Sequence, residues 1–171
     1  MKLERMLKQA GYTLVEILVV LFIISIVTSV ALLSIRSNAD KQIESFANTL
    51  SELVKLAEEQ AMLQPNVMGL SLDKHIFQFS SLQLQENGKL QWFASKDSVL
   101  HQQNIPDNMQ VSLEIQGSRM DFNDTSKNNP QIIISTNGDI TPFTIFLGKV
   151  GEKPRYAIIG EADGSIHTTT V

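Results

Sequence analysis

The sequence contains no cysteine, and aromatic residues make up only 6% of its 171 residues. Without cysteine there is no disulfide framework and no thiolate to act as nucleophile or metal ligand. The histidines, His75, His101 and His167, are far apart in the sequence and show no metal-binding spacing. A Gly-x-Ser-x-Gly motif and a phosphate-binding loop are also missing. These absences leave no catalytic residue, metal site or cofactor site to predict, and they argue against an enzyme.

Glycine and proline are also missing between Tyr12 and Gln64. Because both residues interrupt helices, their absence allows one continuous helix of about 50 residues. Its first part, residues 12–35, is apolar, and Glu16 is the only charged side chain within it. At about 1.5 Å per residue this part is about 36 Å long, enough to cross a hydrocarbon core of about 30 Å with some tilt. We therefore predict a transmembrane and assembly segment over residues 12–35.

The helical pattern continues through residues 36–64 but becomes amphipathic. Apolar residues recur there at spacings of three and four, which places them on one face of a helix. Pro65 is expected to end the helix one or two residues earlier. The apolar face needs a cover, so we expect it to form one wall of the core of the following domain. The face consists of Ile43, Phe46, Ala47, Leu50, Leu53, Val54, Ala57 and Ala61.

Over residues 65–171 the apolar residues alternate with polar ones, which is typical of strands. Asn-Gly or Asp-Gly pairs that end at Gly88, Gly138 and Gly164 predict hairpin turns between successive strands. Residues 117–130 are rich in turn-forming residues and are expected to form a loop. The predicted fold is therefore α+β: a long N-terminal helix packed on an antiparallel, β-rich, sandwich-like head of eight or nine short strands.

Glu16 is the most unusual residue of the apolar segment. An unpaired charge at the centre of a membrane helix costs about 2.5–3.5 kcal/mol on insertion scales, so this carboxylate needs a partner. Lys2, Arg5 and Lys8 precede it, and this positive charge favours an N-terminus on the cytoplasmic side. An ordinary signal anchor, or a signal peptide cut near Ala31, would leave Glu16 unexplained.

The run from Gly11 through Tyr12 to Glu16, Gly-Tyr-Thr-Leu-Val-Glu, and the apolar segment after it resemble the N-terminus of type IV pilins and pseudopilins. The resemblance implies a pilin-like fold and removal of the leader, residues 1–11, by a prepilin peptidase that cuts between Gly11 and Tyr12. It also implies methylation of the new Tyr12 amine and a role for Glu16 in assembly. The amine would lie four residues before Glu16, so the two charges can pair within one chain or between neighbours.

A second block, residues 133–145, resembles the H class of minor pseudopilins of type II secretion, in which a Ser-x-x-Gly-(Glu/Asp)-x-Thr-Pro-Phe run precedes a strand. Here that run extends from Ser135 to Phe143, and Gly160 and Gly164 resemble the closing hairpin of the same class. The resemblance implies a structural subunit that helps to initiate or cap the pseudopilus and to secrete folded proteins across the outer membrane. It also implies other minor pseudopilins and the major pseudopilin as partners, a single-pass anchor in the inner membrane, and a periplasmic head.

The alternative function is that of a minor type IV pilin for DNA uptake or pilus assembly, because DNA-uptake pilins share this kind of head. The resemblance to those proteins implies that basic residues near the C-terminus would contact DNA. Here the tail from Gly164 to Val171 contains no arginine or lysine, and the net charge of the chain is −4. Because phosphate binding requires clustered positive charge, no nucleic-acid partner is expected.

Overall fold

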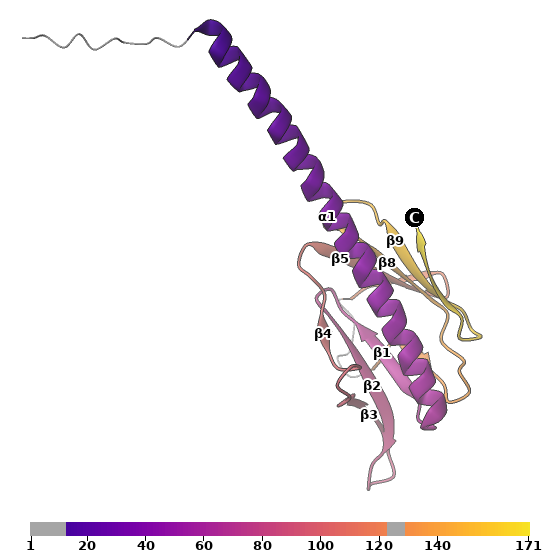
Figure 1. Cartoon of the computed structure of the whole chain (residues 1–171). Coiled ribbons are helices and arrows are strands. Elements are labelled where there is room, and N and C mark those ends of the chain that lie inside the picture. Colours follow the sequence, from indigo (N-terminus) through magenta and orange to yellow (C-terminus); the bar gives the residue numbers. More distant parts are fainter. Residues whose placement is uncertain (1–12, 123–128) are drawn as a thin grey trace, which may run out of the picture. The chain divides into compact units, whose positions relative to one another are not determined.

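The structure, a computed structural model, describes residues 13–122 and 129–171, with only the backbone described for residues 30–39. Contacts within the chain divide it into two units, residues 1–41 and residues 42–171. The described residues form one long helix followed by ten strands (Figure 1). The helix is α1 (Leu14–Leu63), and the strands are β1 (Met68–Leu72), β2 (Ile76–Leu84), β3 (Leu90–Ala94), β4 (Gln103–Asn104), β5 (Met109–Ile115), β6 (Ser118–Met120), β7 (Ile132–Ile134), β8 (Phe143–Lys149), β9 (Tyr156–Gly160) and β10 (Ile166–Thr170).

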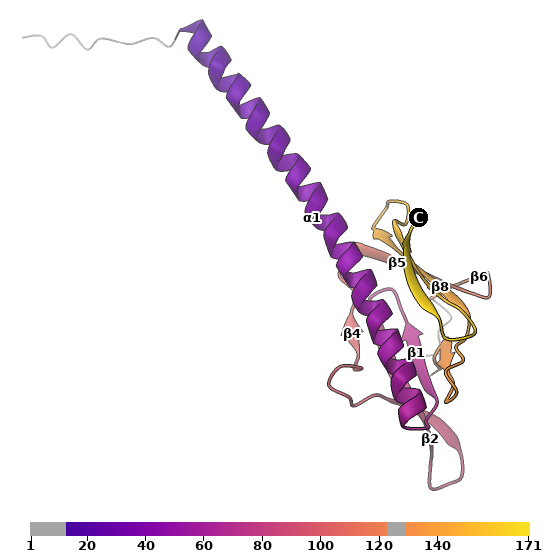
Figure 2. The same ribbon diagram turned by 45° about the vertical axis from the view of Figure 1, so that its right-hand side comes forward.

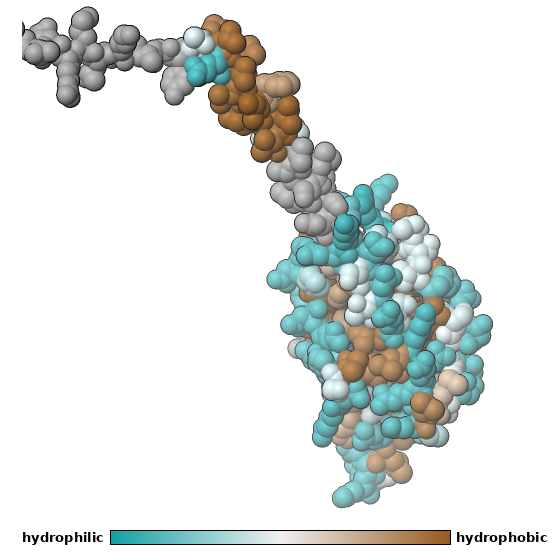
Figure 3. Space-filling view, viewed as in Figure 1, coloured by the Kyte–Doolittle hydropathy of each residue, from teal (hydrophilic) through white to brown (hydrophobic). Residues whose placement is uncertain are grey.

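The first part of α1 is apolar, and its described side chains are exposed. Its large apolar side chains between Leu14 and Val27 are 46–81% exposed, and Figure 3 shows them as a continuous hydrophobic segment. Within the described part of the chain, no helix combines the length and the hydropathy needed to cross a membrane. The span predicted over residues 12–35 includes Tyr12 and the side chains after Ser29, which lie outside the described residues, so it stays a prediction.

From Gln42 onward, α1 presents one apolar face to the core of the second unit, as the amphipathic spacing predicts. Every member of the predicted stripe is buried except Phe46, which is partly buried and packs against the core. The Phe46 ring meets Phe77 edge-on, with the ring centroids 6.0 Å apart. Burial of one such side chain contributes about 1.5–3 kcal/mol, so packing holds this part of the helix more firmly than helix propensity does. α1 ends at Leu63, just before Gln64 and Pro65, as predicted.

Two antiparallel sheets complete the second unit (Figures 1 and 2). The first has the strand order β3-β2-β1-β7, with β4 beside β2, and the second has the order β10-β9-β8-β5-β6. Side chains of the helix face and of both sheets join in a single hydrophobic cluster. The α+β architecture predicted from the sequence, a long helix packed on antiparallel sheets, is therefore confirmed, and Gly88, Gly138 and Gly164 occupy its predicted turns with positive φ angles.

The head has more strands than the eight or nine predicted. β6 lies inside residues 117–130, so the prediction of a loop is wrong for residues 118–120. Gln116 and Gly117 have φ angles of 49° and 78°, and two consecutive positive φ angles are typical of the tight turns that join hairpin strands. Glutamine rarely adopts such an angle, and this is why the turn carries no clear signal in the sequence. Residues 123–128 of the predicted loop lie outside the described residues.

Candidate assembly site

Glu16 lies in the first turn of α1, and Thr13 caps that turn. The Glu16 N–H donates to the Thr13 side-chain Oγ1 at 3.2 Å and to the Thr13 carbonyl at 3.0 Å. Threonine followed three residues later by glutamate is the spacing of a capping box, in which side chains satisfy the free N–H groups at a helix start. Our prediction for Glu16 did not include this local role, although Thr-x-x-Glu is visible in the sequence.

The carboxylate of Glu16 is exposed, and no described residue forms an ion pair or hydrogen bond with it. The positive end of the helix dipole favours its charge, by about 0.3–1 kcal/mol at an exposed position. That contribution is smaller than the cost of placing a carboxylate in an apolar environment. Gly11 and Tyr12, the predicted cleavage and methylation residues, lie outside the described residues together with the rest of the leader.

Two hydroxyl groups further along the apolar helix, those of Thr28 and Ser29, bond to carbonyl groups of the preceding turn. Thr28 Oγ1 donates to the Ile24 carbonyl at 2.6 Å, and Ser29 Oγ donates to the Ser25 carbonyl at 2.8 Å. Such bonds to the preceding turn hide the hydroxyl from an apolar surrounding. No described residue donates a hydrogen bond to the carboxylate of Glu16, so this group still requires a partner.

The block from Ser135 to Pro142 carries the chain from one sheet to the other. It leaves β7, turns tightly with the Ser135 N–H bonded to the Asp139 carbonyl at 2.8 Å, and enters β8. Thr141 fixes the exit from β7, because its N–H donates to the Ile133 carbonyl at 2.9 Å and its Oγ1 accepts the Ile133 N–H at 3.1 Å. The Thr-Pro-Phe run therefore has a structural role at the sheet crossover.

Phe143 and Gly160, two residues of the second resemblance, face each other on the paired strands β8 and β9. The Phe143 side chain is 3% exposed. A Cβ atom placed on Gly160 would lie 2.7 Å from the ring atom Cδ1 and would collide with the neighbouring Cε1. Glycine is therefore required at this position because the buried ring occupies the space of a side chain, and no positive φ angle is involved.

Glu58 of α1 faces the turns that contain Gly138 and Gly164. A Cβ atom on Gly138 would lie 3.4 Å from the Glu58 Oε1, and one on Gly164 would collide with the same oxygen. Partial burial raises the pKa of the Glu58 carboxyl; the negative charges of Glu59 and Asp163 raise it further, and Lys55 opposes them. The helix therefore carries a carboxylate whose ionised form is disfavoured in the folded head.

Replacement of Glu58 by glutamine is expected to stabilise the head at neutral pH. Because the folded-state pKa is raised, the wild-type protein gains stability as the pH falls through that pKa toward the unfolded value near 4.5. The advantage of Glu58→Gln in thermal unfolding midpoint should therefore shrink on acidification. Glu52→Gln, at an exposed position of the same helix, is the matched control. It should leave the unfolding midpoint unchanged both at neutral pH and after acidification. A lower midpoint for Glu58→Gln at neutral pH would contradict this explanation.

Among the described residues, the histidines and the C-terminal tail considered in the sequence are not brought together in a site. Within residues 13–122 and 129–171, no group of three or more His, Asp or Glu residues is placed to hold a metal ion. The C-terminal strand β10 ends the second sheet and carries His167 on an exposed position but no arginine or lysine. Arg155 lies beside the end of the chain, where its carbonyl accepts the Val171 N–H at 2.8 Å.

The sequence comparisons find a known motif at the N-terminus and relatives that match nearly the whole chain. Residues 6–32 match the prokaryotic N-terminal methylation motif. Over nearly its whole length the chain is similar to proteins named type II secretion system protein H. The one from Aeromonas hydrophila is 26% identical over 91% of this chain and 90% of the relative. The one from Pseudomonas aeruginosa is 25% identical over 90% of this chain and 91% of the relative.

Solved structures of similar proteins share the fold. The minor pseudopilin EpsH from the type 2 secretion system of Vibrio cholerae superposes with a TM-score of 0.63 at 20% identity, over 74% of this chain and 94% of the other. The solution structure of Escherichia coli GspH gives a TM-score of 0.61 at 18% identity, over 77% of this chain and 90% of the other. At these identities, the likeness supports the helix-on-sheets architecture.

Proposed function

Because this chain belongs to the protein H family of minor pseudopilins of type II secretion systems, we propose that it helps to initiate or cap the pseudopilus. Pseudopilins are structural proteins, not enzymes. The methylation motif implies processing by a prepilin peptidase, and the motif together with the similarity to type II secretion system protein H implies assembly into a pseudopilus. We further propose that the chain lies at the tip of the filament and that Glu16 and the amine of Tyr12 hold it there.

The unpaired carboxylate of Glu16 within an uncovered apolar helix carries the proposal. Side chains between Leu14 and Val27 are exposed around the helix, so they need lipid before assembly and neighbouring helices afterwards. Removal of residues 1–11 would leave an amine at Tyr12, close in sequence to Glu16. Pairing of that amine with Glu16 of a neighbour would remove the electrostatic cost and set the axial register of the subunit.

The division of the chain follows from this mechanism. Residues 1–11 are the leader, residues 12–35 the membrane and assembly segment, residues 36–64 the amphipathic helix half, and residues 65–171 the periplasmic head. Basic residues before the apolar segment favour a cytoplasmic N-terminus, which sends the head to the periplasm. We propose the other minor pseudopilins as neighbours at the filament tip and the major pseudopilin beneath them.

Loss of the chain from its own host tests this function. Deletion should leave folded secretion substrates in the periplasm, and the full-length chain supplied in trans should restore their export. The competing function in DNA uptake or pilus assembly predicts unchanged secretion together with salt-sensitive DNA binding by the purified full-length chain in a gel-shift titration. That pair of results would overturn the secretion proposal.

A further inference from the structure

The strand β3 forms an open edge of the first sheet. On its inner side, the Ser95 N–H donates to the Phe79 carbonyl at 2.9 Å, and the Gln85 N–H donates to the Lys89 carbonyl at 2.9 Å. In antiparallel pairs such bonds recur at every second residue, so the odd-numbered residues of β3 bond to β2. The N–H and C=O groups of Leu90, Trp92 and Ala94 must therefore point away from the sheet. No strand of the described chain pairs with that side.

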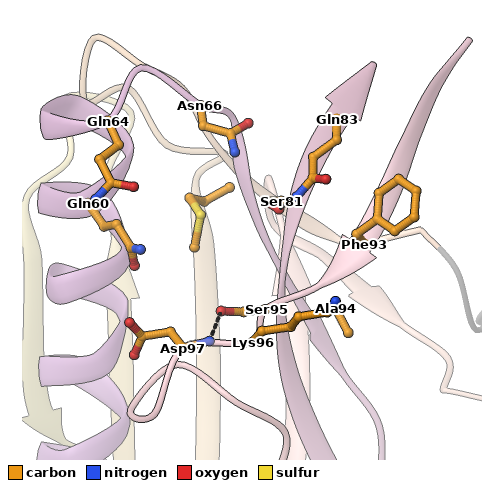
Figure 4. Close-up of a pocket in the computed structure, with 11 residues that line it drawn as sticks. Gln60, Gln64, Asn66, Ser81, Gln83, Phe93, Ala94, Ser95, Lys96 and Asp97 are labelled. Carbon is orange, nitrogen blue, oxygen red and sulfur yellow. Dashed lines mark hydrogen bonds between the residues drawn. The ribbon is translucent and has the colours of Figure 1, made fainter. Parts of the chain in front are cut away.

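A groove of about 580 Å³ lies beside this edge, between the end of α1 and the first sheet. Figure 4 shows Gln60 and Gln64 of the helix facing Ser81 and Gln83 of β2, with Phe93 of β3 on the far side. The side-chain amides of Gln60 and Gln64 make no hydrogen bond with another described residue. Lys96 and Asp97 are the only charged residues of the lining, and their charges are opposite. The groove therefore suits uncharged side chains.

Both faces of the β2–β3 hairpin also expose apolar side chains. Phe93 is 37% exposed on the groove side, where it pairs in register with Ser81. Leu84 and Leu90, a cross-strand pair on the opposite face, are 70% and 65% exposed. Proteins usually protect a free edge with charge, proline or a covering segment, but the residues from Leu90 to Ala94 carry no charge and no proline.

We propose that the free edge of β3 accepts an extended strand from the head of a neighbouring pilin-like subunit. This inference rests on the proposed function, which places such heads beside this one. The main-chain groups of Leu90, Trp92 and Ala94 would bond to the incoming strand and extend the sheet. Alternate side chains of that strand would enter the groove beside Phe93, and the others would lie next to Leu90 on the opposite face.

The exposed main-chain groups of β3 and the lining of the groove indicate what kind of partner binds here. A row of alternating N–H and C=O groups at strand spacing matches the main chain of an extended polypeptide. The nearly uncharged groove and the exposed Phe93 call for uncharged side chains at alternate positions. Heads of this fold offer suitable donors, because their sheets also end in open strands, as β10 does here with the sequence Ile-His-Thr-Thr-Thr.

Ala94→Pro tests the edge directly. Proline at this exposed position removes an outward N–H and costs no bond to β2. Thr168→Pro is the matched control. The Val171 N–H donates to the Arg155 carbonyl and the Glu161 N–H to the Ser165 carbonyl, so the main-chain groups of the even-numbered residues of β10 point away from β9. Thr168→Pro therefore removes an outward N–H from β10, an end strand of the second sheet. Gln83→Glu, which places a charge in the groove, is the second variant in case Ala94→Pro folds poorly.

Binding is measured with the full-length chain in detergent and each other pseudopilin of the same secretion system, purified in the same detergent. We expect one of them to slow amide hydrogen exchange at Leu90, Trp92 and Ala94 by about tenfold or more. Ala94→Pro and Gln83→Glu should each weaken that binding by about tenfold, whereas Thr168→Pro should bind like the wild type.

The possible results separate the two proposals. Two results would overturn the strand-addition inference and leave the proposed function intact. One is that a pseudopilin binds without protecting these amides. The other is that Ala94→Pro and Gln83→Glu both bind it with full affinity. Protection that appears in the isolated chain and grows with its concentration would assign the edge to a second copy and also overturn the inference. Failure of every pseudopilin to bind the wild-type chain would count against the proposed function as well.

Discussion

Replacement of Glu16 by alanine should nearly abolish recruitment of the chain into the pseudopilus while leaving leader removal unchanged. The carboxylate has no partner among the described residues, although it lies in an apolar helix. Removal of one member of a desolvated charge pair costs about 2–5 kcal/mol, which corresponds to at least a roughly 30-fold loss of association. Cross-linking to the major pseudopilin in membranes, together with the mass of the processed chain, measures both quantities.

Two controls separate charge pairing from helix capping. Thr13→Val removes the Oγ1 that accepts the Glu16 N–H at 3.2 Å but keeps the carboxylate, so co-assembly should largely survive. Glu44→Ala removes an exposed carboxylate from the same helix and should have no effect. Normal co-assembly of Glu16→Ala would contradict the proposed pairing, and an equal loss in Thr13→Val would assign the effect to the helix start.

Substitution of Gly160 by valine should unfold or severely destabilise the head. Its Cβ atom would occupy the space of the Phe143 ring, which is buried in the core of the head. Overpacking of a core typically costs about 1–3 kcal/mol, and a collision with a fixed aromatic ring belongs at or above the upper end of that range. Chemical denaturation of the full-length chain in detergent, followed by tryptophan fluorescence, gives the free energy of unfolding.

The double variant Gly160→Val, Phe143→Ala tests the cause. Phe143→Ala alone should cost about 3–5 kcal/mol, because it empties part of the core. If the two side chains compete for one space, the double variant should be clearly more stable than the sum of the single effects predicts. Additive losses would show that Gly160 is required for another reason.

Local patterns in the sequence predicted the elements whose causes are local. The lack of glycine and proline predicted an uninterrupted α1, and the spacing from Ile43 to Ala61 predicted its buried face. Asn-Gly and Asp-Gly pairs predicted three turns whose glycines have positive φ angles. Each of these signals depends on residues within one turn of a helix or one hairpin, so a single sequence contains all the information needed.

Local sequence patterns could not predict contacts between segments that are distant in the sequence. The requirement for Gly160 arises from Phe143, and the raised pKa of Glu58 arises partly from Asp163 on a separate turn. The groove beside β3 likewise combines the end of α1 with two strands. Such sites depend on the order of strands within the sheets, and hydrophobic periodicity does not determine that order.

The N-terminal site shows the same division between local and distant causes. The sequence identified Glu16 as an unusual charge, and the structure added its hydrogen bond to Thr13 at the helix start. The residues that would create the counter-charge, Gly11 and Tyr12, lie outside the described residues, so cleavage and methylation remain predictions. The chemistry of the mature N-terminus therefore decides whether the proposed assembly mechanism holds.

Intact-mass measurement of the full-length chain, extracted from membranes of cells that contain a prepilin peptidase, tests this most directly. We expect a chain that begins at Tyr12 and carries one added methyl group, and Gly11→Ala should accumulate with the leader attached. A wild-type chain that retains Met1, or one cut near Ala31, would contradict the assignment of Glu16 as the assembly residue of a processed pseudopilin.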